Sequence, residues 1–254
     1  MNARDVLNKW FAGKGYRIER SMPIIFREDV RFTVDLDFLI QHEIFRRGGN
    51  FHFVQVGAND GVSRSDDLIQ YVRQFNATGT LVEPQPDLFA ELQKNFADFS
   101  GIELVNKAIH KTEKAMTLYR LDPLVLKGID DLPLWAQTNG IASFDRDHVI
   151  EHAKRIGLGA EVVESQQVPC ITLSELLAQS PHTPDVLKVD TEGYDYEVLS
   201  MLDLAQTRPT IIRFEHLHMS TEQYEGLISR MIEAGYRFLA DKMNTTAYLP
   251  HPAD

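Results

Sequence analysis

Two short apolar segments of the sequence are each followed directly by ionisable side chains. Asp190 and Glu192 follow the first segment, and Glu215 and His216 follow the second. A carboxylate assisted by an imidazole can act as a general base that takes a proton from a hydroxyl group. The same carboxylates could instead bind magnesium, which prefers oxygen donors. We favour Asp190 as the base, helped by His216 or Glu215, because imidazoles suit other metals better than magnesium.

These side chains also have structural interpretations. Asp190 could cap a helix that begins near Tyr194. Glu192 could form a salt bridge with a neighbouring lysine. His148 and His152 have the i, i+4 spacing that places two imidazoles on one helix face. They lack a glutamate in the zincin position, so the sequence predicts no metal site there.

A glycine-bounded turn and a later glutamate are typical of a site for an adenosine ligand. Gly57 and Gly61 flank a tight turn after the apolar segment 51–56. Glycine permits positive φ and lets a ligand approach the backbone closely. Glu83 ends the next apolar segment, where its carboxylate could accept two hydrogen bonds from a ribose diol.

Both NAD and S-adenosylmethionine contain adenosine, so these features alone admit both ligands. The turn reads Gly-Ala-Asn-Asp-Gly, with Asn59 where the dinucleotide fingerprint has its central glycine. A pyrophosphate needs that glycine for close approach of the backbone. The departure counts against NAD.

The elements that position these residues alternate between short apolar strands and amphipathic helices from residue 51 onward. This alternation predicts a mainly parallel sheet with helices on both faces. Two further strands, at 236–240 and 245–249, lie so close in sequence that they are expected to pair antiparallel. Predicted strands occupy 51–56, 80–83, 102–105, 115–119, 185–189 and 210–214, with helices after Ser65, Pro86, Thr172 and Ser220. Thr172 with Glu175, and Ser220 with Gln223, have the capping-box pattern, and the apolar stripe of the last helix is Tyr224, Leu227, Ile228, Met231 and Ile232.

Two segments do not follow this alternation. Residues 1–50 are predicted to be a helical N-terminal extension, which ends at Arg46-Arg47-Gly48-Gly49. Residues 111–165 form an insertion that is too long for a plain connection. We expect it to be a lid over the acceptor or a decoration of the fold, and we assign Phe144 to its core.

Composition excludes several classes of protein. The net charge of −11 disfavours a nucleic-acid substrate, because such proteins usually carry a basic surface. Cys170 is the single cysteine, so the chain has no internal disulfide, and we expect this thiol to be buried and inert. No secretory signal or membrane-spanning run is apparent, so we predict a cytoplasmic protein.

The sequence blocks VQVGANDG, LVEPQPDLFAEL, NKAIH and VLKVDTEGYDYEVL resemble, in order and spacing, the FkbM-type S-adenosylmethionine-dependent methyltransferases. The resemblance covers residues 51–110 and 168–249. It implies an α/β fold, the Rossmann-like seven-stranded class I methyltransferase sheet with helices on both faces. The methyltransferase domain would then be residues 51–254.

The resemblance also implies roles for particular residues. The glycines of the turn and Asn59 would approach the methionine part of the cofactor, and Glu83 would hold the ribose. The segment Asn106–Ala108 would lie near the adenine, and Asp66 would reach the cofactor ammonium. Asp190 and Glu192 would lie beside the methyl group. The implied cofactor-binding set is Gly57, Asn59, Gly61, Asp66, Glu83, Asn106, Ala108 and Glu192.

Methyl transfer from a sulfonium to a hydroxyl is an in-line displacement in which alignment and removal of the hydroxyl proton both matter. The resemblance implies O-methylation of a small-molecule, glycan or lipid-linked acceptor. Two alternatives stay open, namely a nicotinamide-dependent oxidoreductase and a non-catalytic scaffold that keeps the fold. The absent central glycine disfavours the first, and the acidic residues at the strand ends disfavour the second.

Overall fold

The computed structural model describes residues 36–62, 68–129, 132, 133, 136, 141–180 and 182–251. The chain divides into two compact units, Met1–Thr33 and Val34–Asp254. All described residues belong to the second unit. Ser65 and Asp66 lie outside the described residues, as does most of the predicted N-terminal extension.

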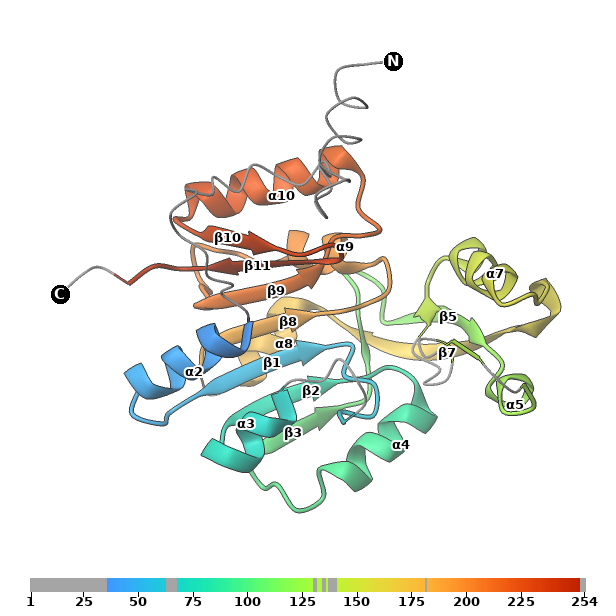
Figure 1. Ribbon diagram of the computed structural model, residues 1–254, viewed down its shortest axis with the longest axis horizontal. Helices are drawn as coiled ribbons and strands as arrows, with labels where there is room; N and C mark the ends of the chain where they lie inside the picture. Colours follow the sequence, from blue (N-terminus) through green and yellow to red (C-terminus); the bar gives the residue numbers. More distant parts are fainter. Residues whose placement is uncertain are drawn as a thin grey trace, which may run out of the picture. The chain divides into compact units, whose positions relative to one another are not determined.

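The second unit is built on a large, mostly parallel sheet (Figure 1). Its strands in the described chain are β1 His52–Val56, β2 Thr78–Val82, β3 Ile102–Val105, β8 Val186–Val189, β9 Ile211–Glu215, β10 Arg237–Ala240 and β11 Asn244–Tyr248. They are arranged in the order β10-β11-β9-β8-β1-β2-β3. Strand β11 runs antiparallel to both β9 and β10, whereas β1, β2, β3, β8 and β9 are parallel. The predicted seven-stranded α/β sheet is confirmed.

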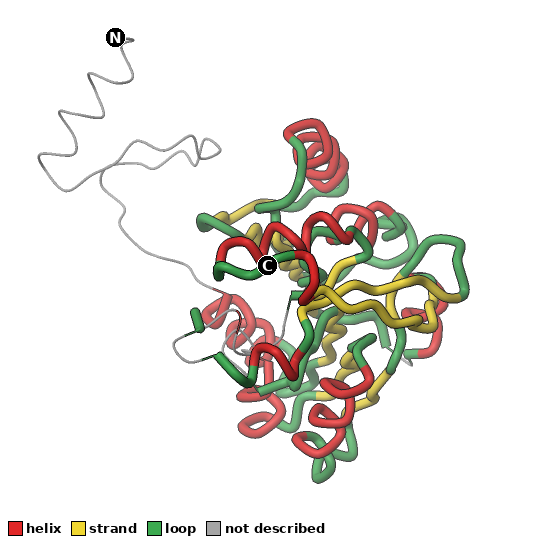
Figure 2. The backbone as a smooth tube through the Cα atoms, turned by 90° about the vertical axis from the view of Figure 1, so that its right-hand side faces the viewer, coloured by secondary structure: helices red, strands yellow, loops and turns green. Residues whose placement is uncertain are grey.

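The helices fill the connections between the strands. Their bounds in the described residues are α2 Leu36–Arg46, α3 Leu68–Phe75, α4 Pro86–Asn95, α5 Pro123–Leu126, α7 Arg146–Arg155, α8 Leu173–Gln179, α9 Asp195–Ser200 and α10 Thr221–Glu233. Strands β1 and β8 are buried along their whole length, as expected when helices cover both faces of a parallel sheet (Figure 2).

One hydrophobic cluster joins helices α2, α3 and α4 to the sheet. Ile40 and Ile44 of α2 pack with Phe53 of β1, Leu68 of α3 and Leu92 of α4. All five side chains are almost completely buried. Helix α2 is therefore part of the same compact unit as the sheet, and the predicted division at residue 50 stays a prediction.

The insertion folds as a small layer of its own. Among the described residues, a four-stranded sheet has the order β4-β7-β5-β6, formed by β4 Ala108–Ile109, β5 Ala115–Leu121, β6 Ala142–Ser143 and β7 Val163–Ile171. Helix α7 packs on this sheet through Val149 and Ala153, in a hydrophobic cluster that includes Leu121. A short 3-10 helix, Ala160–Val162, leads into β7. In its described residues, the insertion therefore has strands, a helix and a hydrophobic cluster of its own.

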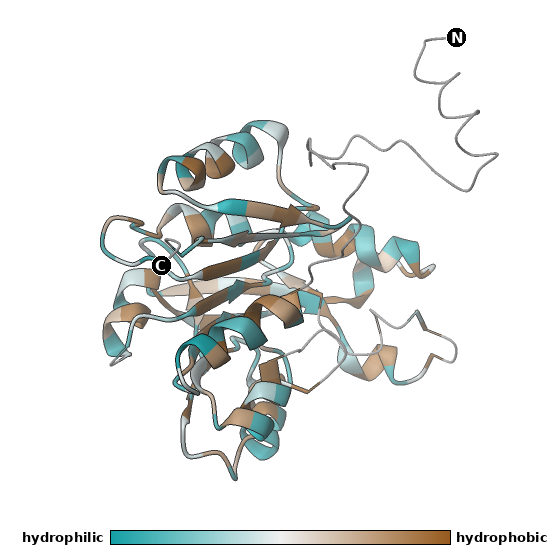
Figure 3. Ribbon diagram, turned by 60° about the vertical axis from the view of Figure 1, so that its left-hand side comes forward, coloured by the Kyte–Doolittle hydropathy of each residue, from teal (hydrophilic) through white to brown (hydrophobic). Residues whose placement is uncertain are grey.

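Local sequence signals fix several helix starts. Thr172 and Ser220 each form the predicted capping box, with Glu175 and Gln223 respectively. Helix α10 carries apolar and polar residues on different sides (Figure 3), and Leu227, Ile228 and Met231 are buried. Ile232, predicted to be part of this apolar stripe, is instead 52% exposed, because it lies at the edge of the buried face.

No helix in the described part of the chain is long and apolar enough to cross a membrane. Cys170 is buried in β7, as predicted.

Candidate active site

A pocket of about 340 Å³ opens at the carboxyl ends of β1, β2 and β8. In parallel sheets this edge is where ligands bind, because the connecting loops diverge there. The insertion supplies the opposite wall through β5 and the segment 141–144. The volume lies within the range of about 300–1,000 Å³ that is usual for ligand pockets.

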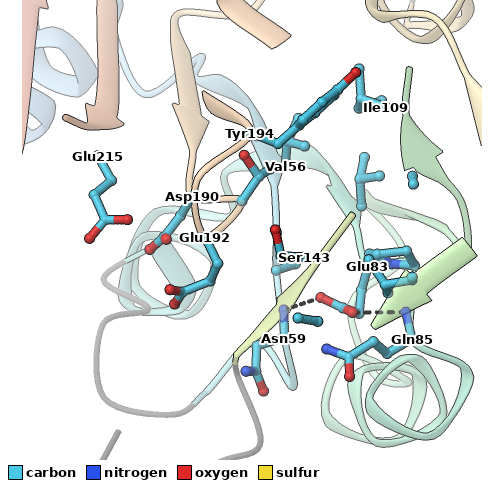
Figure 4. Close-up of a pocket in the computed structure, with 18 of the residues that line it drawn as sticks. Val56, Asn59, Glu83, Gln85, Ile109, Ser143, Asp190, Glu192, Tyr194 and Glu215 are labelled. Atoms are coloured by element: carbon cyan, nitrogen blue, oxygen red, sulfur yellow. Dashed lines mark hydrogen bonds between the residues drawn. The ribbon is translucent and has the colours of Figure 1, made fainter. Parts of the chain in front are cut away.

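Glu83 lines the pocket just beyond the end of β2 and is only 3% exposed. Its Oε2 accepts a hydrogen bond from the backbone N–H of Asn59, and its Oε1 accepts one from the N–H of Gln85, both at 2.9 Å (Figure 4). Burial raises the pKa of Glu83 to about 7, and these hydrogen bonds offset part of the rise. The carboxyl group is therefore rigidly held, with its remaining lone pairs available to a ligand.

The turn after β1 brings the backbone close to the loop after β8. Gly57 has φ of +81°, and a Cβ at this position would collide with the backbone carbonyl of Asp190. Asn59 also has positive φ, and both residues line the pocket. Gly61 does not line it. A side chain at Gly61 would collide with Leu92 of α4 and with Phe96, which directly follows that helix, so this glycine permits helix packing.

The predicted adenine segment is placed only in part at the pocket. Lys107 and Ala108 line it, together with Ile109. Asn106 instead donates from its side chain to the backbone carbonyls of Glu83 at 2.8 Å and Pro84 at 3.2 Å. Asn106 thus fixes the loop that carries Glu83, and it is not among the pocket-lining residues.

Asp190 follows β8 and lines the pocket, with its backbone N–H bonded to the carbonyl of Val56 on β1. Burial raises the pKa of Asp190, and the nearby cations Lys188 and Arg213, together with His218, offset part of that rise. A carboxylate with a raised pKa is a stronger base near neutral pH.

Glu192 and Glu215 lie on the same side of the pocket as Asp190 (Figure 4), whereas Glu83 lies across from them. Burial, and then repulsion from neighbouring carboxylates, raises the pKa of Glu192 well above its usual range. The same causes raise the pKa of Glu215 to about 8. Asp195 orders this region by accepting hydrogen bonds from the N–H groups of Thr191 and Glu215.

The structure does not bring His216 to the pocket. Its Nδ1 is 2.9 Å from Thr245 Oγ1, and its ring packs against Tyr224. Successive strand residues point to opposite faces, so Glu215 and His216 cannot both face the pocket at the end of β9. Asp66, the predicted partner of the cofactor ammonium, lies outside the described residues.

His218 returns to the acidic side of the pocket and meets the insertion there. Its ring centroid is 4.6 Å from that of His148 on α7. His148, Glu192 and His218 each offer a possible ligand atom, and these three atoms lie within 4.8 Å of one another. Burial, and then His218 and His152, lowers the pKa of His148 to about 4.

Sequence reasoning missed several pocket residues. Gln85 orders Glu83, yet no motif singled it out. Phe144 was assigned to the core of the insertion, but it lines the pocket and packs edge-on against Tyr194 with ring centroids 5.0 Å apart. Outside the two ranges that resemble the family most closely, the segment Ile141–Phe144 is similar to a short piece of some family members, and this similarity was the signal that could have found Phe144.

The profile of the methyltransferase FkbM domain matches residues 55–238, which include the insertion and most of the pocket but not β11. The chain therefore belongs to the FkbM methyltransferase family, and it is a methyltransferase. No curated protein sequence matches the chain significantly.

Three solved structures with a related arrangement are distant from this chain in sequence. One is a precorrin-6y C5,15-methyltransferase from Geobacter metallireducens GS-15, with 12% identity and a TM-score of 0.38, covering 78% of this chain and 80% of that one. Another is an rRNA methylase from Streptococcus thermophilus, with 6% identity and a TM-score of 0.40, covering 87% of this chain and 100% of that one. A third is the METTL16 methyltransferase domain, with 8% identity and a TM-score of 0.44, covering 83% of this chain and 64% of that one. The family assignment rests on the profile, and the fold rests on the strand order.

Proposed function

We propose that this protein transfers a methyl group from S-adenosylmethionine to a hydroxyl group of a small-molecule, glycan or lipid-linked acceptor. The observation that carries this proposal is one pocket with Glu83 on one side and Asp190 on the other. The first suits the ribose of an adenosine cofactor, and the second suits the proton of an attacking hydroxyl.

The pocket fits the cofactor in three respects. The positive φ of Gly57 lets the turn after β1 pass against the carbonyl of Asp190, and this turn brings the backbone of Gly57, Ala58 and Asn59 to the wall of the pocket, where a ligand can contact it. Glu83 is a buried acceptor with lone pairs left for the ribose diol. Apolar side chains of β4 and the insertion offer a surface for the adenine: Ala108, Ile109, Leu118, Ile141 and Phe144.

The bound cofactor would supply an activated methyl group on its sulfonium. Asp190 would accept the proton of the acceptor hydroxyl as the oxygen attacks. Transfer would form a bond between the acceptor oxygen and the methyl carbon while the carbon–sulfur bond breaks, with S-adenosylhomocysteine as the leaving group. We assign Glu215 the task of holding the acceptor beside Asp190, because His216 faces away from the pocket.

Calorimetric titration with S-adenosylhomocysteine and, as a control, with NAD tests the cofactor assignment. We expect one S-adenosylhomocysteine per chain and no heat from NAD. Binding of NAD alone would support the oxidoreductase alternative, and absence of both would support the non-catalytic scaffold.

Incubation with cofactor labelled at the methyl carbon and a panel of sugars, polyols and phenols tests the acceptor class. We expect the label to appear on an oxygen, which the carbon chemical shift of the product identifies. Labelling of nitrogen or carbon acceptors alone would contradict O-methylation. A cytoplasmic location stays a prediction.

A further inference from the structure

We propose that His148, Glu192 and His218 bind a divalent first-row transition-metal ion at the wall of the pocket. The three residues come from α7, from the turn after β8 and from the loop after β9. Their potential ligand atoms lie within 4.8 Å of one another. Side-chain rotation can close that distance to metal–ligand bonds of about 2.0–2.2 Å. Two imidazoles and one carboxylate suit zinc, iron, cobalt or manganese better than magnesium.

His148 and His152, both on α7, differ in whether their ring nitrogens have hydrogen-bond partners. His152 Nδ1 is 3.1 Å from the backbone carbonyl of His148, and its Nε2 is 3.3 Å from Arg155 Nη1. The Nε2 of His148 is buried and has no hydrogen-bond partner among the described residues. His148 is therefore available as a ligand, whereas His152 is not.

The segment His148–His152 also matches the inverted zincin pattern H-x-x-E-H. The structure argues against that arrangement, because Glu151 is exposed and both ring nitrogens of His152 have partners. The donor set comes instead from three separate elements.

Glu215 gives a second, independent indication of a cation. It is 8% exposed, and its Oε2 is buried without a hydrogen-bond partner within the described chain. This oxygen lies 3.6 Å from His218 Nε2. Buried polar atoms in folded proteins nearly always have a partner. An ion held by His148, Glu192 and His218 would supply a partner to His148 Nε2, and the negative charge of an ionised Glu215 beside His218 would favour that ion without making Glu215 one of its three ligands.

The backbone at this point is shaped around the histidines. Glu192 has φ of +51°, an uncommon value for a residue other than glycine, and Gly193 follows with φ of +101°. A Cβ on Gly193 would lie 3.6 Å from His218 Cβ and 3.8 Å from His148 Cε1. Backbone strain of this kind concentrates at functional sites.

The ion would lie close to the acceptor hydroxyl, whose proton the reaction must remove, because Glu192 and Glu215 also line the pocket that contains Asp190. With three protein ligands, a coordination position stays open for the acceptor oxygen. A coordinated hydroxyl is more acidic, so Asp190 would remove its proton more easily. This role rests on the proposed methyl transfer, whereas binding of the ion does not.

Titration with cobalt(II) tests the site on the full chain without a histidine tag, after chelator treatment and dialysis. We expect one cobalt ion per chain, with visible absorption bands that indicate nitrogen ligands. His148→Ala and His218→Ala should each weaken binding by about 100-fold or more, since loss of even an outer-shell partner costs about 10–100-fold. His42→Ala removes a histidine whose side chain is 59% exposed on α2, and it should bind cobalt like the wild type.

Glu192→Gln provides a variant with nearly unchanged shape, and it should also weaken binding. Thermal unfolding of every variant shows whether it is folded. No cobalt binding by the wild type, or equal binding by the wild type, His148→Ala and Glu192→Gln, would overturn the proposal.

Binding of S-adenosylhomocysteine in the presence of a chelator separates this proposal from the proposed function. Cofactor binding without any cobalt site would leave the methyltransferase assignment intact and refute the metal site. If the protein binds no cofactor but binds cobalt, and the variants bind cobalt more weakly, the metal site is supported and the assignment of the cofactor is refuted.

Discussion

Glu83→Gln should weaken cofactor binding in a manner that depends on pH. In the free protein the pKa of Glu83 is raised to about 7, mainly by burial. The ionised carboxylate is the form that accepts two hydrogen bonds from a ribose diol. Binding of the cofactor should therefore favour the ionised form, and affinity should fall as the pH decreases through 7.

The expected size follows from the fraction of ionised Glu83. At pH 8 about nine-tenths of the molecules carry the carboxylate, and at pH 6 about one-tenth do, so the dissociation constant should rise about tenfold. Glutamine cannot ionise and lacks one acceptor oxygen. Because hydrogen bonds to charged groups contribute roughly 1.5–3 kcal/mol, Glu83→Gln should lose more than tenfold in affinity at pH 8. The gap between the two proteins should narrow toward pH 6.

The same group affects the free energy of unfolding. A carboxyl group with a pKa of about 7 when folded and an ordinary 4.5 when unfolded stabilises the fold fully only below pH 4.5. That stability decreases as the pH rises to 7, by roughly 3 kcal/mol in total. Glu83→Gln should make this decrease smaller.

Calorimetry with S-adenosylhomocysteine at several pH values, in buffers of different ionisation enthalpy, measures both the affinity and the proton released. Glu103→Gln, on the exposed side of β3, is the matched control and should behave like the wild type. An affinity that does not change between pH 6 and pH 8, or the same slope in Glu83→Gln, would refute the reasoning.

Three further substitutions test the site and its support. Gly57→Ala should lower the free energy of unfolding by more than about 2 kcal/mol, since it adds backbone strain and a collision with Asp190. The control Gly157→Ala, also at positive φ but in open space, should lower the free energy of unfolding by only about 1–2 kcal/mol. Equal losses in the two variants would contradict this account. Asp190→Asn should keep cofactor affinity while lowering turnover on the order of 100-fold, and an unchanged rate would remove Asp190 as the base. Arg120→Met removes contacts to Gln85, Asp87 and Glu164, so urea denaturation should show a loss of roughly 1–3 kcal/mol, and a loss near zero would mean that this pairing is not stabilising.

Much of the large sheet could be predicted because its signals are local. Strand β3 has the predicted bounds, and the capping boxes at Thr172 and Ser220 mark the starts of α8 and α10. Each signal depends on a few adjacent residues, through side-chain alternation or a hydrogen bond across one helical turn. The antiparallel pairing of β10 and β11 followed from the short connection between them.

The insertion was harder to predict because its order depends on distant partners. Strand β5 was expected, but β7, which pairs with it along its whole length, mixes polar and apolar residues over 163–171. The two strands are separated by more than one helix in the sequence. Only the pairing shows that the insertion is a folded layer.

The direction of side chains at a strand end was the other feature that could not be predicted from the sequence. The sequence places Glu215 and His216 together, but the pleat at the end of β9 turns one into the pocket and the other toward Thr245. His218, two residues further, faces the pocket side and meets His148. The i, i+4 spacing places His148 and His152 on one helix face. The three residues that could hold a metal ion are instead His148, Glu192 and His218, which are far apart in the chain.

The two parts of the molecule contribute differently to the site. Gly57, Glu83 and Asp190 all come from loops of the large sheet, and these positions would hold the cofactor and the base. The insertion contributes apolar side chains on one side of the pocket, and it also places His148 beside Glu192, which lines the pocket. A change in the insertion can therefore alter which acceptor fits, and whether a metal ion is held beside it, without moving the residues assigned to the cofactor. The choice of acceptor then depends on the part of the fold whose structure is set by long-range pairing, and for this reason local sequence motifs indicate the cofactor more clearly than the acceptor.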